Sequence, residues 1–195
     1  MQRRSNKASA PQLRIIGGQW RGRKLSFPSR PGLRPTGDRV RETLFNWLSP
    51  RLSGARCLDL FAGSGALGIE ALSRGAAHCD FIDTDSATLR AIEQHLLTLD
   101  ARDRAGVIYG AATDQLNLAN TPWDIVFVDP PFDCGLGYPV LSQLLEKRCL
   151  HSESLVYFET RRSQPETVPE AAYEVLRDKT AGDVRYRLFK PVKPV

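Results

Sequence analysis

Apolar residues along this chain recur with two alternating periods, which predicts strands and helices in turn. Residues 86–99 carry four apolar side chains with 3-4-3 spacing, and Ser86 is the expected N-cap of that helix. Residues 125–128 (IVFV) are apolar throughout, which is typical of a strand buried on both faces. The same criteria predict strands at 55–60, 79–83, 106–109, 125–128 and 155–158, and helices at 36–48, 66–74, 86–99, 112–118 and 138–148.

This alternation predicts an α/β fold in which the strands run parallel and right-handed helical crossovers cover both faces of the sheet. The end of the chain breaks the pattern. Residues 173–179 and 184–190 read as two strands joined by the turn at 181–183, so we expect an antiparallel hairpin at the sheet edge. The full expectation is a mostly parallel, seven-stranded, Rossmann-like sheet.

The first 35 residues differ from the rest in pattern and in charge. Residues 1–11 lack apolar periodicity and are expected to be a disordered basic tail, whereas 12–35 read as a β-hairpin followed by a Pro/Gly-rich connector. The main domain is expected at 36–195. Residues 1–51 hold 12 Lys and Arg against two acidic residues, a charge of +10, and the remainder carries −5, which together give +5. A basic arm on a mildly acidic body indicates a polyanionic partner.

The hairpin interleaves basic side chains with an aromatic one, as surfaces that bind nucleic acid do. Cations contact phosphates, and an aromatic ring stacks on bases. The alternative is a solvated hairpin whose Trp20 packs against the body of the protein. The residues expected to bind nucleic acid are Arg14, Trp20, Arg21, Arg23, Lys24, Arg34 and Arg39.

Composition narrows the class of protein further. The hydrophobic share of 42% and charged share of 25% are those of a soluble globular protein, with no transmembrane stretch and no secretory signal. The four cysteines form no C-x-x-C pair and have no His-rich neighbourhood, so neither a metal site nor a disulfide framework is expected. A reducing cytoplasm fits best.

A glycine-rich turn follows the first strand of the main domain and precedes a helix, where open α/β sheets bind cofactors. Residues 63–68 satisfy G-x-G-x-x-G, a pattern that also occurs in dinucleotide-binding dehydrogenases. Asp59 argues for another cofactor, because its carboxylate would repel a pyrophosphate and attract a cationic amino-acid amine. Asp83 ends the next strand, where an acidic side chain accepts hydrogen bonds from ribose hydroxyls.

The sequence Asp129-Pro130-Pro131-Phe132 directly follows the buried strand at 125–128 and carries the most specific chemistry in the chain. The prolines fix the backbone and remove N–H donors, so Asp129 and the Pro130 carbonyl are expected to accept hydrogens from an amine. Phe132 offers a flat face on which a planar base can stack.

These segments resemble S-adenosylmethionine-dependent methyltransferases that modify nitrogen atoms and share an [N/D]-P-P-[Y/F/W] motif. RIIGGQWRGRKL, RPTGDRVRETLFNWL, DLFAGSGALGIEALSRGA and FVDPPF most closely resemble the bacterial RsmD family of small-subunit ribosomal RNA guanine-N2 methyltransferases, from about residue 13 to about 190. The resemblance implies the class I methyltransferase fold, a cytoplasmic monomer, and 16S ribosomal RNA as substrate, on an assembled or assembling 30S particle.

The resemblance also implies roles for individual residues. Asp59, Phe61 and the turn Ala62-Gly63-Ser64-Gly65 would hold the methionine part of the cofactor, and Asp83 its ribose. Gly110 and Ala111 would flank the adenine. Many relatives place Asp or Asn at the position of Gly110, and Asp114 is a candidate substitute. The catalytic residues would be Asp129, Pro130, Pro131 and Phe132.

Three other functions are compatible with parts of the sequence. The same chemistry could act on a DNA base or a protein glutamine, since the D/N-P-P-aromatic motif serves all of these substrates. An NAD(P)-dependent oxidoreductase would use the glycine fingerprint but would leave the D-P-P-F sequence unexplained. A non-catalytic ribosome assembly factor could retain the cofactor-binding fold.

Overall fold

The structure is a computed structural model that describes residues 11–28, 37–118, 121–132, 134–164 and 171–192. The tail expected at 1–11 therefore lies outside the described residues except for its last position. Arg34 and the boundary expected at residue 36 also lie outside them.

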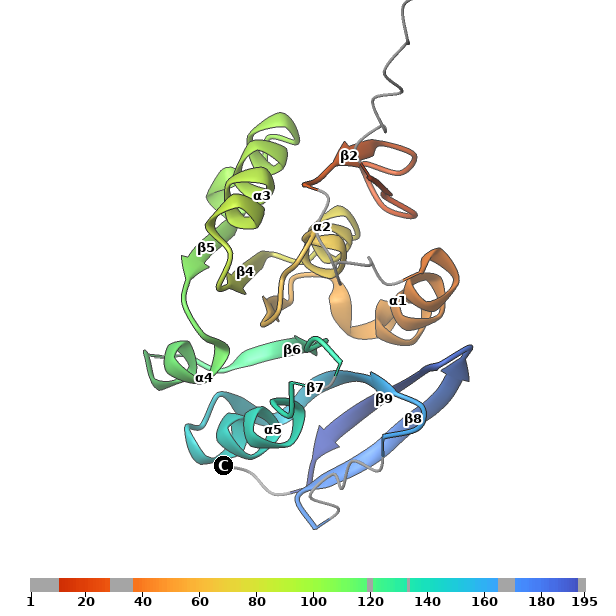
Figure 1. Cartoon of the computed structure of the whole chain (residues 1–195), viewed down its shortest axis with the longest axis vertical. Coiled ribbons are helices and arrows are strands. Elements are labelled where there is room, and N and C mark those ends of the chain that lie inside the picture. Colours follow the sequence, from red (N-terminus) through yellow and green to blue (C-terminus); the bar gives the residue numbers. More distant parts are fainter. Residues whose placement is uncertain (1–10, 29–36, 119–120, 133, 165–170, 193–195) are drawn as a thin grey trace, which may run out of the picture.

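Seven strands form one mixed sheet in the order β5-β4-β3-β6-β7-β9-β8 (Figure 1). The first five in this order are mutually parallel, whereas β9 is antiparallel to both β7 and β8. This confirms the predicted fold class, including the antiparallel hairpin at the edge. The strands are β3 (Arg56–Asp59), β4 (His78–Asp83), β5 (Ala105–Tyr109), β6 (Trp123–Val128), β7 (Leu150–Arg161), β8 (Tyr173–Ala181) and β9 (Val184–Pro191).

Helices cover both faces of the sheet and bury two separate apolar cores. The helices α1 (Asp38–Leu52), α2 (Ala66–Ser73) and α3 (Ser86–Thr98) pack on one face, around Phe81, Phe127 and Tyr157. On the other face, α4 (Ala112–Gln115) and α5 (Gly137–Glu146) pack around Val126, Val128 and Phe158. Two short 3-10 turns, Arg102–Arg104 and Leu116–Leu118, complete the connections.

The N-cap of α3 differs from the one expected. Asp85, not Ser86, takes this position, and its Oδ1 accepts a hydrogen bond of 2.7 Å from the backbone N–H of Ala87. The Thr88 hydroxyl donates to the other oxygen of the same carboxylate. The carboxylate satisfies one of the orphan N–H groups of the helix, and its negative charge interacts favourably with the helix N-terminus.

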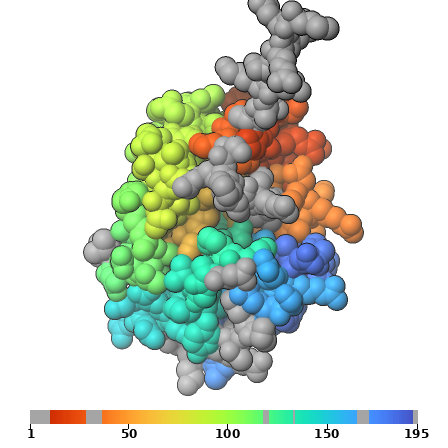
Figure 2. Space-filling view, viewed as in Figure 1, coloured from red at the N-terminus to blue at the C-terminus, as the bar shows by residue number. Residues whose placement is uncertain are grey.

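The N-terminal hairpin pairs β1 (Gln12–Arg14) with β2 (Lys24–Ser26), with Leu13 opposite Leu25. Its apolar side chains belong to the core that contains α1, α2 and α3. The hairpin lies beside α3 (Figure 2). A ring nitrogen of His95 on α3 is 2.8 Å from the carbonyl oxygen of Ser26 in the hairpin. The expected hairpin is therefore present, as an element packed onto the sheet domain.

No helix within the described parts of the chain is both long and apolar enough to cross a membrane.

Candidate active site

The glycine-rich turn is built by backbone geometry that only glycine adopts easily. Gly63 and Gly65 both have left-handed φ values, +49° and +74°. Hydrogen bonds from the N–H of Ala62 to the Ile82 carbonyl and from Gly65 to the Ala62 carbonyl close the turn against β4. A Cβ on Gly68 would lie 2.2 Å from the Phe81 ring, so this third glycine permits α2 to pack directly on the sheet.

Asp59 stands at the end of β3 and faces the first turn of α2. Its side chain is buried, and its Oδ2 accepts a 2.9 Å hydrogen bond from the Gly68 N–H. Burial raises the pKa of this carboxyl to about 8, the Gly68 N–H opposes that shift, and the charges of Asp129 and Asp83 add to it. Three acidic side chains therefore converge above the ends of β3, β4 and β6.

This accumulation of negative charge tests which cofactor the site fits. A pyrophosphate would bring further negative charge next to Asp59, Asp83 and Asp129, whose mutual repulsion already disfavours the ionised form of Asp59. An amino-acid ammonium and a sulfonium supply the opposite charge, so the residues fit S-adenosylmethionine better than a dinucleotide.

Asp83 lies next to the turn and holds it in place. Its Oδ2 accepts the Gly63 N–H at 2.8 Å, and its Oδ1 accepts the Asp85 N–H at the same distance. Gly110 directly follows the neighbouring strand β5, and its N–H donates to the Asp83 carbonyl. Gly110 has a φ of +154°, and a Cβ there would lie 2.3 Å from the Gln115 amide nitrogen. The Gln115 side chain thus occupies the space that an Asp or Asn at this position would need.

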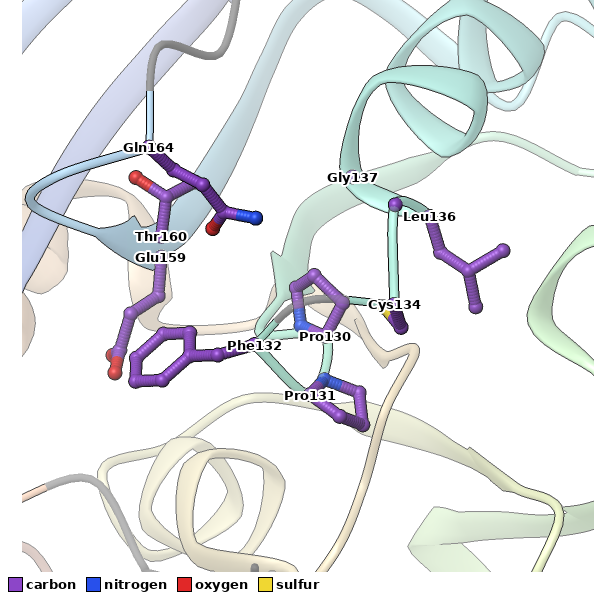
Figure 3. Close-up of a pocket in the computed structure, with 10 residues that line it drawn as sticks. Pro130, Pro131, Phe132, Cys134, Leu136, Gly137, Glu159, Thr160 and Gln164 are labelled. Atoms are coloured by element: carbon purple, nitrogen blue, oxygen red, sulfur yellow. The ribbon is translucent and has the colours of Figure 1, made fainter.

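The D-P-P-F loop directly follows β6. Pro130 is buried and Pro131 is exposed, and Phe132 keeps 36% of its surface accessible. The Arg161 guanidinium carbon lies 5.5 Å from the centre of the Phe132 ring, a cation–π contact that holds the ring near β7. The loop lines a small pocket together with residues of β7 and the segment before α5 (Figure 3).

Glu159 also lines this pocket and was missed by the sequence analysis. Its side chain is only 6% exposed, and its Oε2 accepts a 2.7 Å hydrogen bond from the Tyr157 hydroxyl. Figure 3 shows its carboxylate beside the Phe132 ring. The signal in the sequence was an acidic residue directly after the apolar run 155–158, in a strand that the structure extends to Arg161.

The buried Asp59 carboxyl gives the ligand-free protein a predictable response to pH. Its folded pKa of about 8 exceeds the usual 3.8, so ionisation favours the unfolded chain, and the penalty grows from pH 3.8 to 8. Asp59→Asn should therefore raise the free energy of unfolding at pH 8 by about 1–3 kcal/mol, because protein relaxation offsets part of the full cost. Thermal melting of wild type and variant at pH 5 and pH 8 measures this gain.

The gain in stability should vanish towards pH 4, and binding of S-adenosylmethionine by the variant should weaken. An Asn variant that is less stable than wild type at pH 8 would contradict the raised pKa.

The described residues expected to bind RNA divide into exposed basic side chains and one buried aromatic side chain, Trp20. Arg14, Arg21, Arg23 and Lys24 are exposed, as is Arg39 on α1. Arg14 donates to Asp38 at 3.1 Å, so part of its charge is neutralised within the protein.

The expectation that Trp20 stacks on bases is wrong. Its side chain is only 6% exposed and belongs to the core, and the Arg104 guanidinium carbon lies 5.4 Å from its ring centre. The alternative, in which Trp20 packs against the body, is what the structure contains. The physical reason is that burying a large indole stabilises the attachment of the small hairpin.

A third buried carboxylate, Glu70 on α2, anchors this hairpin and was also missed by the sequence analysis. It accepts hydrogen bonds from the N–H groups of Ile16 and Gly17 at 2.8 and 2.7 Å, and from Arg74 Nε at 2.7 Å. The same helix thus begins at the glycine-rich turn and ends at the hairpin. An acidic residue within a helix whose other positions are apolar or small was the available signal.

The strand order, the glycine-rich turn and the converging carboxylates define a class I S-adenosylmethionine-dependent methyltransferase. A family model described as "Conserved hypothetical protein 95" matches residues 13–190, and the chain belongs to this family. This confirms the resemblance to the RsmD family, because curated relatives that match nearly the whole chain are named as small-subunit ribosomal RNA methyltransferases.

Two of these relatives and one solved structure show how close the similarity is. "Ribosomal RNA small subunit methyltransferase D" of Escherichia coli strain K12 is 48% identical over 188 residues, covering 96% of this chain and 94% of the relative. The protein of the same name from Haemophilus influenzae is 45% identical over 182 residues, covering 92% and 94%. The structure titled "Putative methyltransferase yhhF from Escherichia coli" superposes with a TM-score of 0.85 at 48% identity, covering 93% of this chain and 98% of that one.

Proposed function

We propose that this protein transfers a methyl group from S-adenosylmethionine to the exocyclic N2 amine of a guanine in 16S ribosomal RNA. The acceptor is an assembled or assembling small-subunit particle, and the enzyme acts as a cytoplasmic monomer. The observation that carries the proposal is the D-P-P-F loop beside the acidic cofactor site, in a chain 48% identical to a small-subunit ribosomal RNA methyltransferase.

The resemblance to the family and the position of the acidic cluster support the following cofactor roles. Asp59 and the turn at 62–65 would hold the methionine part, with Phe61 beside them. Asp83 would accept hydrogen bonds from the ribose hydroxyls. Gly110 and Ala111 would flank the adenine through their backbone. When bound, S-adenosylmethionine supplies an electrophilic methyl group on a sulfonium.

Asp129 and Pro130 would activate the substrate amine. The lone pair of the guanine N2 amine is delocalised into the ring, so this nitrogen is a poor nucleophile. A carboxylate and a backbone carbonyl that accept its two hydrogens favour a tetrahedral nitrogen and free the lone pair. Asp129 also stabilises the positive charge that develops on nitrogen during transfer. Because the sulfonium is already a strong electrophile, positioning the amine for in-line transfer should contribute most to the rate enhancement.

The target base must be unpaired or flipped out of its helix to reach this loop. Phe132 is accessible enough to stack on the base and to replace part of the stacking that the base loses. Pro131 fixes the loop that presents the ring.

The exposed basic residues of the hairpin would bind the phosphates of the RNA. Deleting the hairpin would also uncover the apolar core beneath it, so charge substitutions test this role more cleanly. The triple substitution Arg21→Ala, Arg23→Ala and Lys24→Ala should weaken RNA binding and lower the slope of log affinity against log salt by about 2. Titrations of RNA at several salt concentrations measure the slope.

Lys147→Ala is the matched control, because this exposed cation lies at the end of α5 on the opposite face of the sheet. It should leave the slope unchanged. An unchanged slope in the triple variant would mean that the hairpin does not contact phosphates.

Labelled methyl transfer tests the proposed function against its alternatives. The acceptors are small-subunit particles from a strain that lacks this protein, double-stranded DNA, and soluble cell protein. We expect label in the RNA of the particles alone. Label in DNA or protein would favour the rival substrates, and no transfer would favour an assembly factor. A melting temperature raised by NAD but not by S-adenosylmethionine would favour an oxidoreductase.

A further inference from the structure

Glu159 is an acidic side chain for which the mechanism above provides no role. It follows Phe158 in β7, and Asp129 follows Val128, which lies opposite Phe158 in the parallel pair β6–β7. The two carboxyls therefore extend side by side from neighbouring strands, which are about 4.8 Å apart in a sheet. Both point to the face of the sheet that Phe127 and Tyr157 occupy.

Placing the buried Glu159 carboxyl beside Asp129 makes its ionisation in the folded protein unfavourable. Burial raises the pKa of Glu159 to about 8, the charge of Asp129 adds to the shift, and the hydrogen bond from Tyr157 opposes it. A glutamine could accept the same hydrogen bond from the Tyr157 hydroxyl without the cost of a buried charge. A carboxylate accepts hydrogen bonds more strongly than an amide oxygen does, so its position in the pocket points to a ligand that donates hydrogen bonds.

The surroundings of Glu159 show where that ligand would lie. The carboxylate lines the pocket with Pro130 and Phe132, and it lies beside the edge of the aromatic ring (Figure 3). A planar base stacked on Phe132 would present its edge to Asp129 and Glu159 together. Two neighbouring acceptors match an edge with two neighbouring donors.

We propose that Glu159 accepts the N1–H of the target guanine and thereby selects guanine as the substrate. The proposal rests on the proposed function, because N1–H adjoins the N2 amine that Asp129 and Pro130 would engage. Adenine and cytosine carry an unprotonated ring nitrogen at the corresponding position. Above about pH 8, where Glu159 is ionised, such a base would leave a buried carboxylate facing a lone pair, and sites of this kind reject substrates strongly.

The test compares guanine with 2,6-diaminopurine at the methylated position of small-subunit RNA reconstituted into particles. Diaminopurine keeps the 2-amine but has no N1–H. At a pH above about 8, where Glu159 is ionised, the wild-type enzyme should methylate it with kcat/KM lowered roughly 100-fold. Equal rates on the two bases by the wild-type enzyme would overturn the proposal without any variant.

Glu159→Gln provides the second arm, because the amide N–H can donate to N1 of diaminopurine. The variant should lose roughly 100-fold in kcat/KM on guanine while its preference for guanine over diaminopurine disappears or reverses. Tyr157→Phe is the matched control. It removes the hydroxyl that contacts Glu159 and keeps the carboxylate, so the preference for guanine should remain.

The outcomes separate this proposal from the proposed function. If the wild-type enzyme methylates no guanine in the particles, the proposed function fails. If the wild-type enzyme does methylate guanine, the role of Glu159 in base selection alone can still fail. It fails if Glu159→Gln lowers kcat/KM on guanine and on diaminopurine by the same factor, or leaves kcat/KM on guanine unchanged.

Discussion

Asp129→Ala should lower methyl transfer by about 10³-fold, the largest loss of activity that we expect from one substitution. The variant lacks the carboxylate that would orient the amine and stabilise its developing charge. Binding of S-adenosylmethionine should change less than tenfold, because Asp59, Asp83 and the glycine-rich turn remain. Single-turnover rates on small-subunit particles and calorimetric titration of the cofactor measure the two effects separately.

Asp129→Asn is the matched control for this substitution. Its amide oxygen can still accept a hydrogen from the amine, and Asn occupies this position in related motifs, so activity should fall far less than in the Ala variant. Full activity of Asp129→Ala would remove the argument built on the D-P-P-F loop. A parallel loss of cofactor affinity would move the role of Asp129 from the amine to the cofactor.

Glu70→Ala should cause the largest loss of stability, about 3–5 kcal/mol in the free energy of unfolding. The Glu70 side chain is 0% exposed, and its removal leaves the N–H groups of Ile16 and Gly17 without their acceptor. It also removes the carboxylate that lies 3.6 Å from Nη1 of the buried Arg41. Denaturant unfolding and hydrogen exchange across residues 12–28 are the measurements.

We expect faster exchange in the hairpin before any change in the sheet, because the lost contacts join these two parts. Glu93→Ala is the control, since the ion pair of Glu93 with Arg102, at 3.6 Å, is exposed to solvent. A loss below about 1 kcal/mol in Glu70→Ala would mean that Glu70 does not anchor the hairpin.

The fold could be predicted from local patterns because each element carries its own periodicity and its own boundary residues. The apolar run 125–128 became a central strand, and the turn at 181–183 became the edge hairpin. The glycines at 63, 65 and 68 indicated their structural role because glycine alone satisfies the backbone and packing constraints found there.

Contacts between distant segments could not be predicted in this way. Trp20 looked like a stacking residue because the sequence does not show which side of a hairpin faces the body. Glu70 and Glu159 were missed because a single acidic residue in an apolar element resembles an ordinary surface charge. Glu70 accepts hydrogen bonds from residues 53 and 54 positions away, and Glu159 lies near the charge of Asp129, which follows the neighbouring strand; both relations become apparent only in the folded chain.

The most direct test of the central claim is to identify the methylated base. Small-subunit particles from a strain that lacks this protein are incubated with the enzyme and S-adenosylmethionine, and the RNA is digested and mapped by mass spectrometry. The account predicts one new N2-methylguanosine at a single position in wild-type reactions and none with Asp129→Ala. A methyl group on another atom or another base would contradict it.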